Sequence, residues 1–194
     1  RGNPLARTPA QDMHLRLRVR TATLSGHSGN YGLLPNAAFR LSALLASMKD
    51  AKGNATVDGL MDDVEPPTSA ERTTVAQASQ AEETMARHFG VRRFDGDAGI
   101  PYYERLLFRP GLIVNEVSAG RPGNQVPNTA EAILEVRLVT AQDPHHVFDA
   151  VRRHVAGFEM AQGWEPAAEL EYVEGVAASW MHETEPTVAR GIRA

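Results

Sequence analysis

The sequence contains no cysteine, which excludes disulfide bonds, thiolate metal sites and a cysteine nucleophile. Aromatic residues are scarce at 6%, and no apolar run approaches the roughly 18 residues that a membrane-spanning helix needs. The formal net charge of -4 shows no basic excess of the kind that indicates nucleic acid as a partner. These absences lead us to expect a cytoplasmic protein that binds neither nucleic acid nor a membrane.

Hydrophobic residues make up 42% of the 194 residues, which is enough for the core of one domain. Four segments either alternate between apolar and polar residues or are continuously apolar over the length of a strand. In two other segments, apolar residues recur at helical spacing. The strands are expected at residues 14–20, 112–117, 130–138 and 168–173, and the helices at residues 35–52 and 143–162. This order predicts an α+β, ferredoxin-like βαββαβ sandwich, in which two helices cover one face of a four-stranded antiparallel sheet.

Residues 54–108 fit none of these core elements, and we expect them to form an insertion between the first helix and the second strand. Within the insertion, the polar and alanine-rich residues 69–88 predict a helix. The segment DGDAGIPYYERLLFRPG at residues 95–111 is expected to be a loop.

The residue pattern also predicts the ends and faces of the core segments. In residues 130–138 every second residue is apolar and is expected to face the core, which leaves Arg137 on the polar face. The first helix is expected to stop at Gly53. Asp143 is expected to cap the start of the second helix.

Residues 25–32 read SGHSGNYG, a segment in which three glycines surround His27. It approaches the G-x-S-x-G elbow of serine hydrolases, but Asn30 replaces the final glycine and the expected sheet is not parallel. A glycine-rich loop between strand and helix is also where backbone N–H groups hold an anion. However, the spacing G-x-x-G-x-x-G is neither a dinucleotide fingerprint nor a P-loop. The residues favour neither chemistry.

The seven histidines do not form a metal-binding pattern, since none stands in an HExxH or H-x-D context. Neighbouring His145 and His146 point to different sides of a helix, and we assign no metal ligand within this chain. Two interpretations of His27 stay open. Either it caps or packs within its turn, or its small neighbours Gly26 and Gly29 adopt unusual backbone angles and present it to a site outside this chain.

Two segments resemble a known family. Residues 27–48 read HSGNYGLLPNAAFRLSALLASM, and residues 124–139 read NQVPNTAEAILEVRLV. Together they resemble the lid, or dimerisation, domain of the zinc aminoacylase, carnosinase and glutamate-carboxypeptidase-like peptidases. The shared features are an HSG sequence, an N-x-I-P loop and an arginine at the end of the next strand. The chain departs from the family's Gly-Gly pair at Leu33 and from its Asn-Pro pair at Ala37.

The resemblance implies that residues 1–178 form the lid and dimerisation domain, and that residues 179–194 begin the return to a missing catalytic domain. That domain of the same polypeptide would hold two zinc ions, so the isolated chain is expected to be inactive. The full-length protein would be a homodimeric hydrolase that acts on a peptide or an N-acyl amino acid. It would be a metallopeptidase such as a dipeptidase or carboxypeptidase, or an aminoacylase. The alternative is a free-standing ferredoxin-like module that binds a ligand or a protein without catalysis.

The resemblance also implies roles for three residues. His27 would be catalytic: it would reach across the dimer into the other subunit's active site and donate a hydrogen bond to the scissile carbonyl oxygen. Asn124 and Arg137 would bind the substrate, the arginine through a charge-assisted bond to a carboxylate. The alternative for Arg137 is a surface salt bridge with Glu135 or Glu131.

Overall fold

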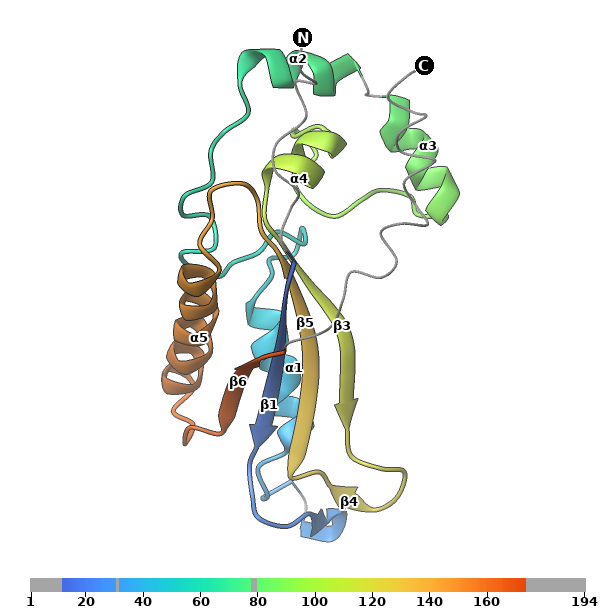
Figure 1. Ribbon diagram of the computed structural model, residues 1–194. Coiled ribbons are helices and arrows are strands. Elements are labelled where there is room, and N and C mark those ends of the chain that lie inside the picture. Colours follow the sequence, from blue (N-terminus) through green and yellow to red (C-terminus); the bar gives the residue numbers. More distant parts are fainter. Residues whose placement is uncertain (1–11, 31, 78–79, 174–194) are drawn as a thin grey trace.

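Four antiparallel strands form the main sheet in the order β3-β5-β1-β6 (Figure 1). The computed structural model describes residues 12–30, 32–77 and 80–173. The core strands and helices are β1 (Asp12–Arg20), α1 (Ala37–Ser47), β3 (Gly111–Ala119), β5 (Thr129–Arg137), α5 (Pro144–Ala161) and β6 (Ala168–Tyr172). The predicted βαββαβ order and the antiparallel sheet are therefore confirmed. Residues 179–194, where we expect the return to a catalytic domain, lie outside the described residues.

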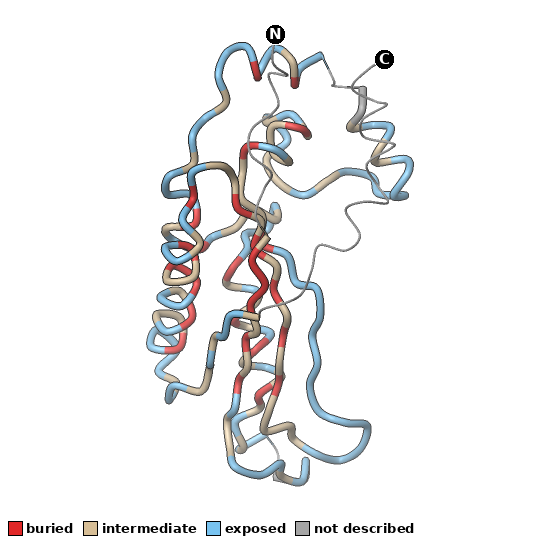
Figure 2. Tube along the Cα trace, viewed as in Figure 1, coloured by how far each residue is buried: buried red, intermediate tan, exposed pale blue. Residues whose placement is uncertain are grey.

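Both core helices pack on one face of the sheet, α1 over β5 and β1, and α5 beside α1 and β6. Figure 2 shows that buried residues follow the central strands and the helices that cover them. The predicted alternation along β5 is confirmed, since every second residue from Ala130 to Val136 is buried. Core side chains at most 1% exposed include Leu15, Leu17, Leu41, Leu44, Leu134 and Val151. Burying each such side chain contributes about 1.5–3 kcal/mol, so this layer of contacts stabilises the domain.

The opposite face of the sheet carries charges that pair between strands. Arg18 Nη2 lies 2.8 Å from Glu131 Oε2 on β5, and Arg16 Nη1 lies 3.3 Å from Glu171 Oε2 on β6. The arginines of β1 therefore find partners within the domain. Because these side chains are partly exposed, each pair contributes only about 0–1 kcal/mol, much less than the core.

The helix α1 starts with a cap and ends earlier than predicted. The side chain of Asn36 accepts hydrogen bonds from two backbone N–H groups of the first turn. The helix ends at Ser47, so the prediction that it stops at Gly53 is wrong. The carboxylate of Asp50 accepts a hydrogen bond from the N–H of Lys52 at 2.8 Å. This local bond favours a turn over further helix, and Gly53 lies within that turn at φ 88°.

The described residues of the insertion include the helices α2 (Ser69–Gln77), α3 (Gln80–Phe89) and α4 (Tyr102–Phe108). The described residues of the helix expected at residues 69–88 lie in α2 and α3. The loop expected at residues 95–111 is wrong, because that segment contains α4. Tyr103 and Phe108 of α4 are buried against Val75 of α2, in a small second core that stabilises α4. The insertion lies at the end of the sheet where β1 begins and β5 ends (Figure 1). None of the helices in the described part of the chain has the length and apolar surface that crossing a membrane requires.

At the opposite end of the main sheet, two short strands pair with each other. They are β2 (Gly26–His27) and β4 (Gln125–Val126), and the 3-10 helix η1 (Ser28–Asn30) follows β2. This small antiparallel sheet joins the loop after β1 to the connection between β3 and β5 (Figure 1). The sequence predicts only loops here, because two-residue strands are too short to show a period.

Candidate functional site

His27 lies on β2, beyond the end of the main sheet. In the antiparallel register it stands opposite Gln125 of β4. One residue further, the N–H of Ser28 donates to the backbone oxygen of Asn124 at 3.0 Å. The fold therefore brings two of the predicted site residues, His27 and Asn124, side by side at one end of the domain.

The imidazole of His27 is oriented by its own loop. Its Nδ1 accepts a hydrogen bond from the backbone N–H of Gly29 at 2.9 Å. This bond assigns the proton of the neutral ring to Nε2, which is then a hydrogen-bond donor. The residue is exposed. The ring therefore caps a backbone N–H within its own turn, as the first interpretation holds. Its presentation to a site outside this chain stays a prediction.

Asn128 secures the loop that carries His27, a role that the sequence does not predict. Its side-chain Nδ2 donates to the backbone oxygen of Ala22 at 3.0 Å, and its Oδ1 accepts from the hydroxyl of Ser25 at 2.8 Å. Its backbone oxygen accepts from the N–H of Thr21 at 2.9 Å. These three bonds hold the segment between β1 and β2 against the start of β5. In the sequence, Asn128 is marked only as the asparagine directly after the proline of NQVPN. A Pro-Asn pair occurs in many loops and does not indicate this role.

Arg137 lies at the other end of β5, beside the insertion. Its Nε is 3.3 Å from Oδ1 of Asp12, which faces it in the register of β1 and β5. The arginine side chain is 27% exposed. From the sequence, Glu135 or Glu131 is an alternative partner for Arg137. In the structure Asp12 forms an ion pair with Arg137, and Glu131 contacts Arg18 at 2.8 Å. The polar face predicted for Arg137 is confirmed, because its chain neighbours Val136 and Leu138 are buried.

His27 and Arg137 lie far apart within one chain, at opposite ends of the sheet. Arg137 and Thr129 bound the nine-residue strand β5, and Thr129 pairs with Arg20 just before the His27 loop. Eight steps of about 3.3 Å separate the ends of such a strand by about 26 Å. Asn124 and His27 lie beyond the Thr129 end. A single small substrate therefore cannot contact both His27 and Arg137 of the same chain.

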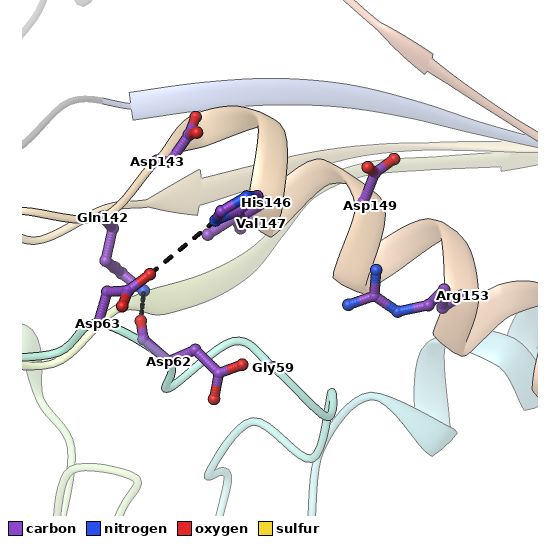
Figure 3. Close-up of a pocket in the computed structure, with 9 residues that line it drawn as sticks. All are labelled: Gly59, Asp62, Asp63, Gln142, Asp143, His146, Val147, Asp149 and Arg153. Atoms are coloured by element: carbon purple, nitrogen blue, oxygen red, sulfur yellow. Dashed lines mark hydrogen bonds and ion pairs between the residues drawn. The ribbon is translucent and has the colours of Figure 1, made fainter.

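A pocket between the insertion and the start of α5 gathers several charges (Figure 3). Its lining residues are Gly59, Asp62, Asp63, Gln142, Asp143, His146, Val147, Asp149 and Arg153. Asp143 caps α5 as predicted, by accepting from a backbone N–H at 2.8 Å. Gln142 donates to the backbone oxygen of Leu60 at 2.8 Å and ties the insertion to the core. His146 and Asp63 are exposed to solvent and lie 4.0 Å apart. We therefore assign structural roles to Gln142 and Asp143 and treat His146 and Asp63 as solvated surface groups.

Histidines elsewhere in the domain also have structural contacts. Burial lowers the pKa of His154, whose Nε2 lies 2.9 Å from Oγ of Ser47, so this ring bridges α1 and α5 in its neutral form. His14 is 8% exposed and lies 3.8 Å from Glu135. Among residues 12–30, 32–77 and 80–173, no three or more His, Asp or Glu side chains are grouped so as to hold a metal ion.

Comparison with known proteins agrees with the resemblance seen in the sequence. A family described as the peptidase dimerisation domain matches residues 10–158. The chain is 28% identical over 134 residues to the Beta-Ala-His dipeptidase of Rattus norvegicus, and this match covers 66% of the chain and 27% of that protein. Nothing in these matches favours a free-standing module.

Solved structures share the fold. An M20 family metallo-carboxypeptidase, Sso-CP2 from Sulfolobus solfataricus, is 25% identical with a TM-score of 0.69, covering 84% of this chain and 42% of that chain. Human carnosine dipeptidase 1 is 22% identical with a TM-score of 0.75, covering 84% and 36%. The chain therefore spans less than half the length of each of these relatives.

Proposed function

Because this chain belongs to the peptidase dimerisation domain family, we propose that it is the dimerisation and lid domain of a metal-dependent peptidase or amidohydrolase. The relatives named above are a dipeptidase and a metallo-carboxypeptidase, both longer than this chain. The described residues offer no group of ligands that fits a metal centre. The proposal therefore assigns the metal, expected to be two zinc ions, to a catalytic domain elsewhere in the polypeptide, and expects this chain alone to be inactive.

The edge strand β3 supports a homodimer. Among the described strands, β5 is its one neighbour in the sheet. On the side of the sheet that the helices cover, Val114 and Val117 of β3 are 40% and 54% exposed. Their cross-strand partners, Leu134 and Ala132, are buried. A second copy beside β3 would bury both valines and the exposed Phe39 of α1, with the same patch used on each subunit.

His27 fits the role of a donor in the active site of the other subunit. Its proposed chemistry depends on Nε2–H, the donor that the bond from Gly29 to Nδ1 leaves on the neutral ring. As water adds to a scissile carbonyl, negative charge develops on the carbonyl oxygen. A hydrogen bond aimed at that oxygen is worth about 100- to 1000-fold in rate. Asn124, beside His27, would contact the same substrate through its amide.

Arg137 then belongs to a different active site from His27 of the same chain. The separation of about 26 Å along β5 is the single observation that carries this division. We assign Arg137 to the site of its own subunit, where the guanidinium would hold a substrate carboxylate. The ion pair with Asp12 would orient the guanidinium. Each active site of the dimer would thus combine Arg137 from one subunit with His27 and Asn124 from the other.

The test is His27→Ala in the full-length enzyme. We expect kcat to fall by about 100- to 1000-fold, because the carbonyl oxygen loses its donor. Metal content and dimer mass should stay unchanged, since the domain holds no described metal ligand group. His145→Ala removes another exposed histidine and should leave kcat unchanged. An unchanged kcat in His27→Ala would contradict the proposal, as would a loss of activity that merely follows a loss of metal.

A further inference from the structure

We propose that Gly29 is a positioning residue for His27, and that it acts in two ways at once. Its N–H holds Nδ1 of the imidazole, and its lack of a side chain leaves room for the ring. This inference rests on the proposed function of His27 and adds to it the element that sets the direction and tautomer of the donor.

The space for the ring exists only because residue 29 is glycine. A β-carbon built at residue 29 would lie 2.8 Å from Nδ1 of His27 and 3.2 Å from Cε1. Non-bonded carbon contacts are favourable at about 3.5–4.0 Å, so the first of these distances is a collision. Any other residue at position 29 would have to turn the ring away or shift the loop.

The reason for Gly29 is space, which differs from the expectation that it adopts an unusual backbone angle. Among the loop's glycines, Gly32 has the left-handed angle, with φ 75°, and a β-carbon there would meet no atom within 4 Å. Gly29 does not have such an angle. The two glycines therefore serve different ends: Gly32 allows the chain to turn, and Gly29 allows the imidazole to rest on the backbone.

The contact also sets the chemistry of the ring. The strand pairing with β4 fixes the backbone of His27, and η1 then brings the N–H of Gly29 back to within 2.9 Å of Nδ1. A ring that accepts at Nδ1 carries its proton at Nε2, so the donor is on the far side of the imidazole from the loop. The bond spans two residues of one chain, so the donor is oriented before any partner or substrate arrives.

The experiment is Gly29→Ala in the full-length enzyme. We expect kcat to fall by about 10- to 100-fold, with a smaller change in KM, because a misplacement of about 1 Å weakens the bond to the carbonyl oxygen. Dimer mass and metal content should be unchanged. Gly99→Ala is the matched control, since a β-carbon there meets no atom within 4 Å and its backbone angle is ordinary. It should leave kcat unchanged.

Ring ¹⁵N spectra give a readout that loss of folding would not produce. In the wild type, the neutral His27 ring should show an unprotonated Nδ1 and a protonated Nε2. In Gly29→Ala, the tautomer protonated at Nδ1 should appear. An unchanged His27 spectrum with a kcat within about twofold of the wild type would overturn the inference.

A double variant separates positioning from general damage to the loop. Once the ring is absent, the collision is also absent, so Gly29→Ala should add no further loss of kcat or thermal stability to His27→Ala. A further loss in the double variant would show that Gly29 acts on the loop and not through the ring. If His27→Ala itself keeps full activity, the proposed function fails. If His27→Ala is impaired while Gly29→Ala is normal, only the role of Gly29 fails.

Discussion

The two ends of the sheet hold their candidate residues in opposite ways. At one end, His27 is exposed on a two-residue strand and is oriented by a backbone N–H. At the other end, Arg137 closes the long strand β5, which has β1 and β3 on either side, and pairs with Asp12. The first arrangement presents a side chain outward, and the second holds one against the body of the domain. This is the difference we expect between a residue that serves the other subunit and one that serves its own.

Substitutions at the two ends of the sheet should also differ in their effects on turnover and on folding. The His27 loop is held by individual hydrogen bonds, each with a net contribution of about 0.5–1.5 kcal/mol. Arg137 stands on the strand whose alternate residues form the main core. Altering the loop should therefore change turnover while the domain stays folded.

The largest effect is expected from separating the subunits with Val117→Glu. This residue is 54% exposed on the edge strand β3 and would be buried in the dimer. A buried, unsatisfied polar group costs about 1–3 kcal/mol, and the two-fold axis places one on each subunit, so the Kd of the dimer should rise by about 30-fold or more. Sedimentation over a concentration series measures the Kd. The resulting monomers should lose activity as His27→Ala does, because no His27 reaches their sites.

The matched control is Tyr172→Glu on β6, the opposite edge strand. Tyr172 is 51% exposed, and β6 already carries exposed Glu169 and Glu171, which discourage pairing between edges. This variant should remain dimeric. If Val117→Glu stays dimeric and active, β3 is not the dimer edge. If it becomes monomeric yet stays fully active, His27 does not serve the other subunit.

A smaller effect is expected from Asn128→Asp, which changes the support of the His27 loop. A carboxylate cannot donate to the backbone oxygen of Ala22, so the bond at 3.0 Å is lost while Ser25 can still donate. The loss of one hydrogen bond should lower kcat by about 3- to 10-fold, with the dimer intact. Steady-state kinetics measures this change.

Asn54→Ala is the control at the end of the sheet that carries Arg137. The side-chain Nδ2 of Asn54 donates to the carboxylate of Asp50 at 3.0 Å. It removes a comparable bond in a turn that is not connected to His27, and it should leave kcat unchanged. Equal losses in Asn54→Ala and Asn128→Asp would mean that both act through general stability, and the distinction between the two ends would not hold.

The core of the fold could be predicted from the sequence because its signals are local. The alternation of residues 130–138 predicts both faces of β5, and Asp143 before Pro144 predicts the start of α5. The helix α4 could not be predicted, because Tyr103 is buried against Val75, nearly thirty positions earlier in the chain. The early end of α1 was missed because the carboxylate of Asp50 competes for backbone N–H groups.

The candidate site was only partly accessible from the sequence. The family resemblance identified His27, Asn124 and Arg137, and their roles stay predictions. It did not indicate that Arg137 lies at the opposite end of β5, since distance depends on the strand register. The roles of Gly29 and Asn128 depend on contacts between a side chain and a backbone group, which no residue spacing reveals.

The central claim is tested most directly by a mixed dimer with His27→Ala in one subunit and Arg137→Ala in the other. If each active site takes Arg137 from its own subunit and His27 from the other, one site of this dimer has both residues and the other has neither. Its kcat should then be about half that of the wild type, although each variant alone, as a homodimer, is strongly impaired. A mixed dimer no more active than the two homodimers would contradict the account, because both residues would then serve the same subunit.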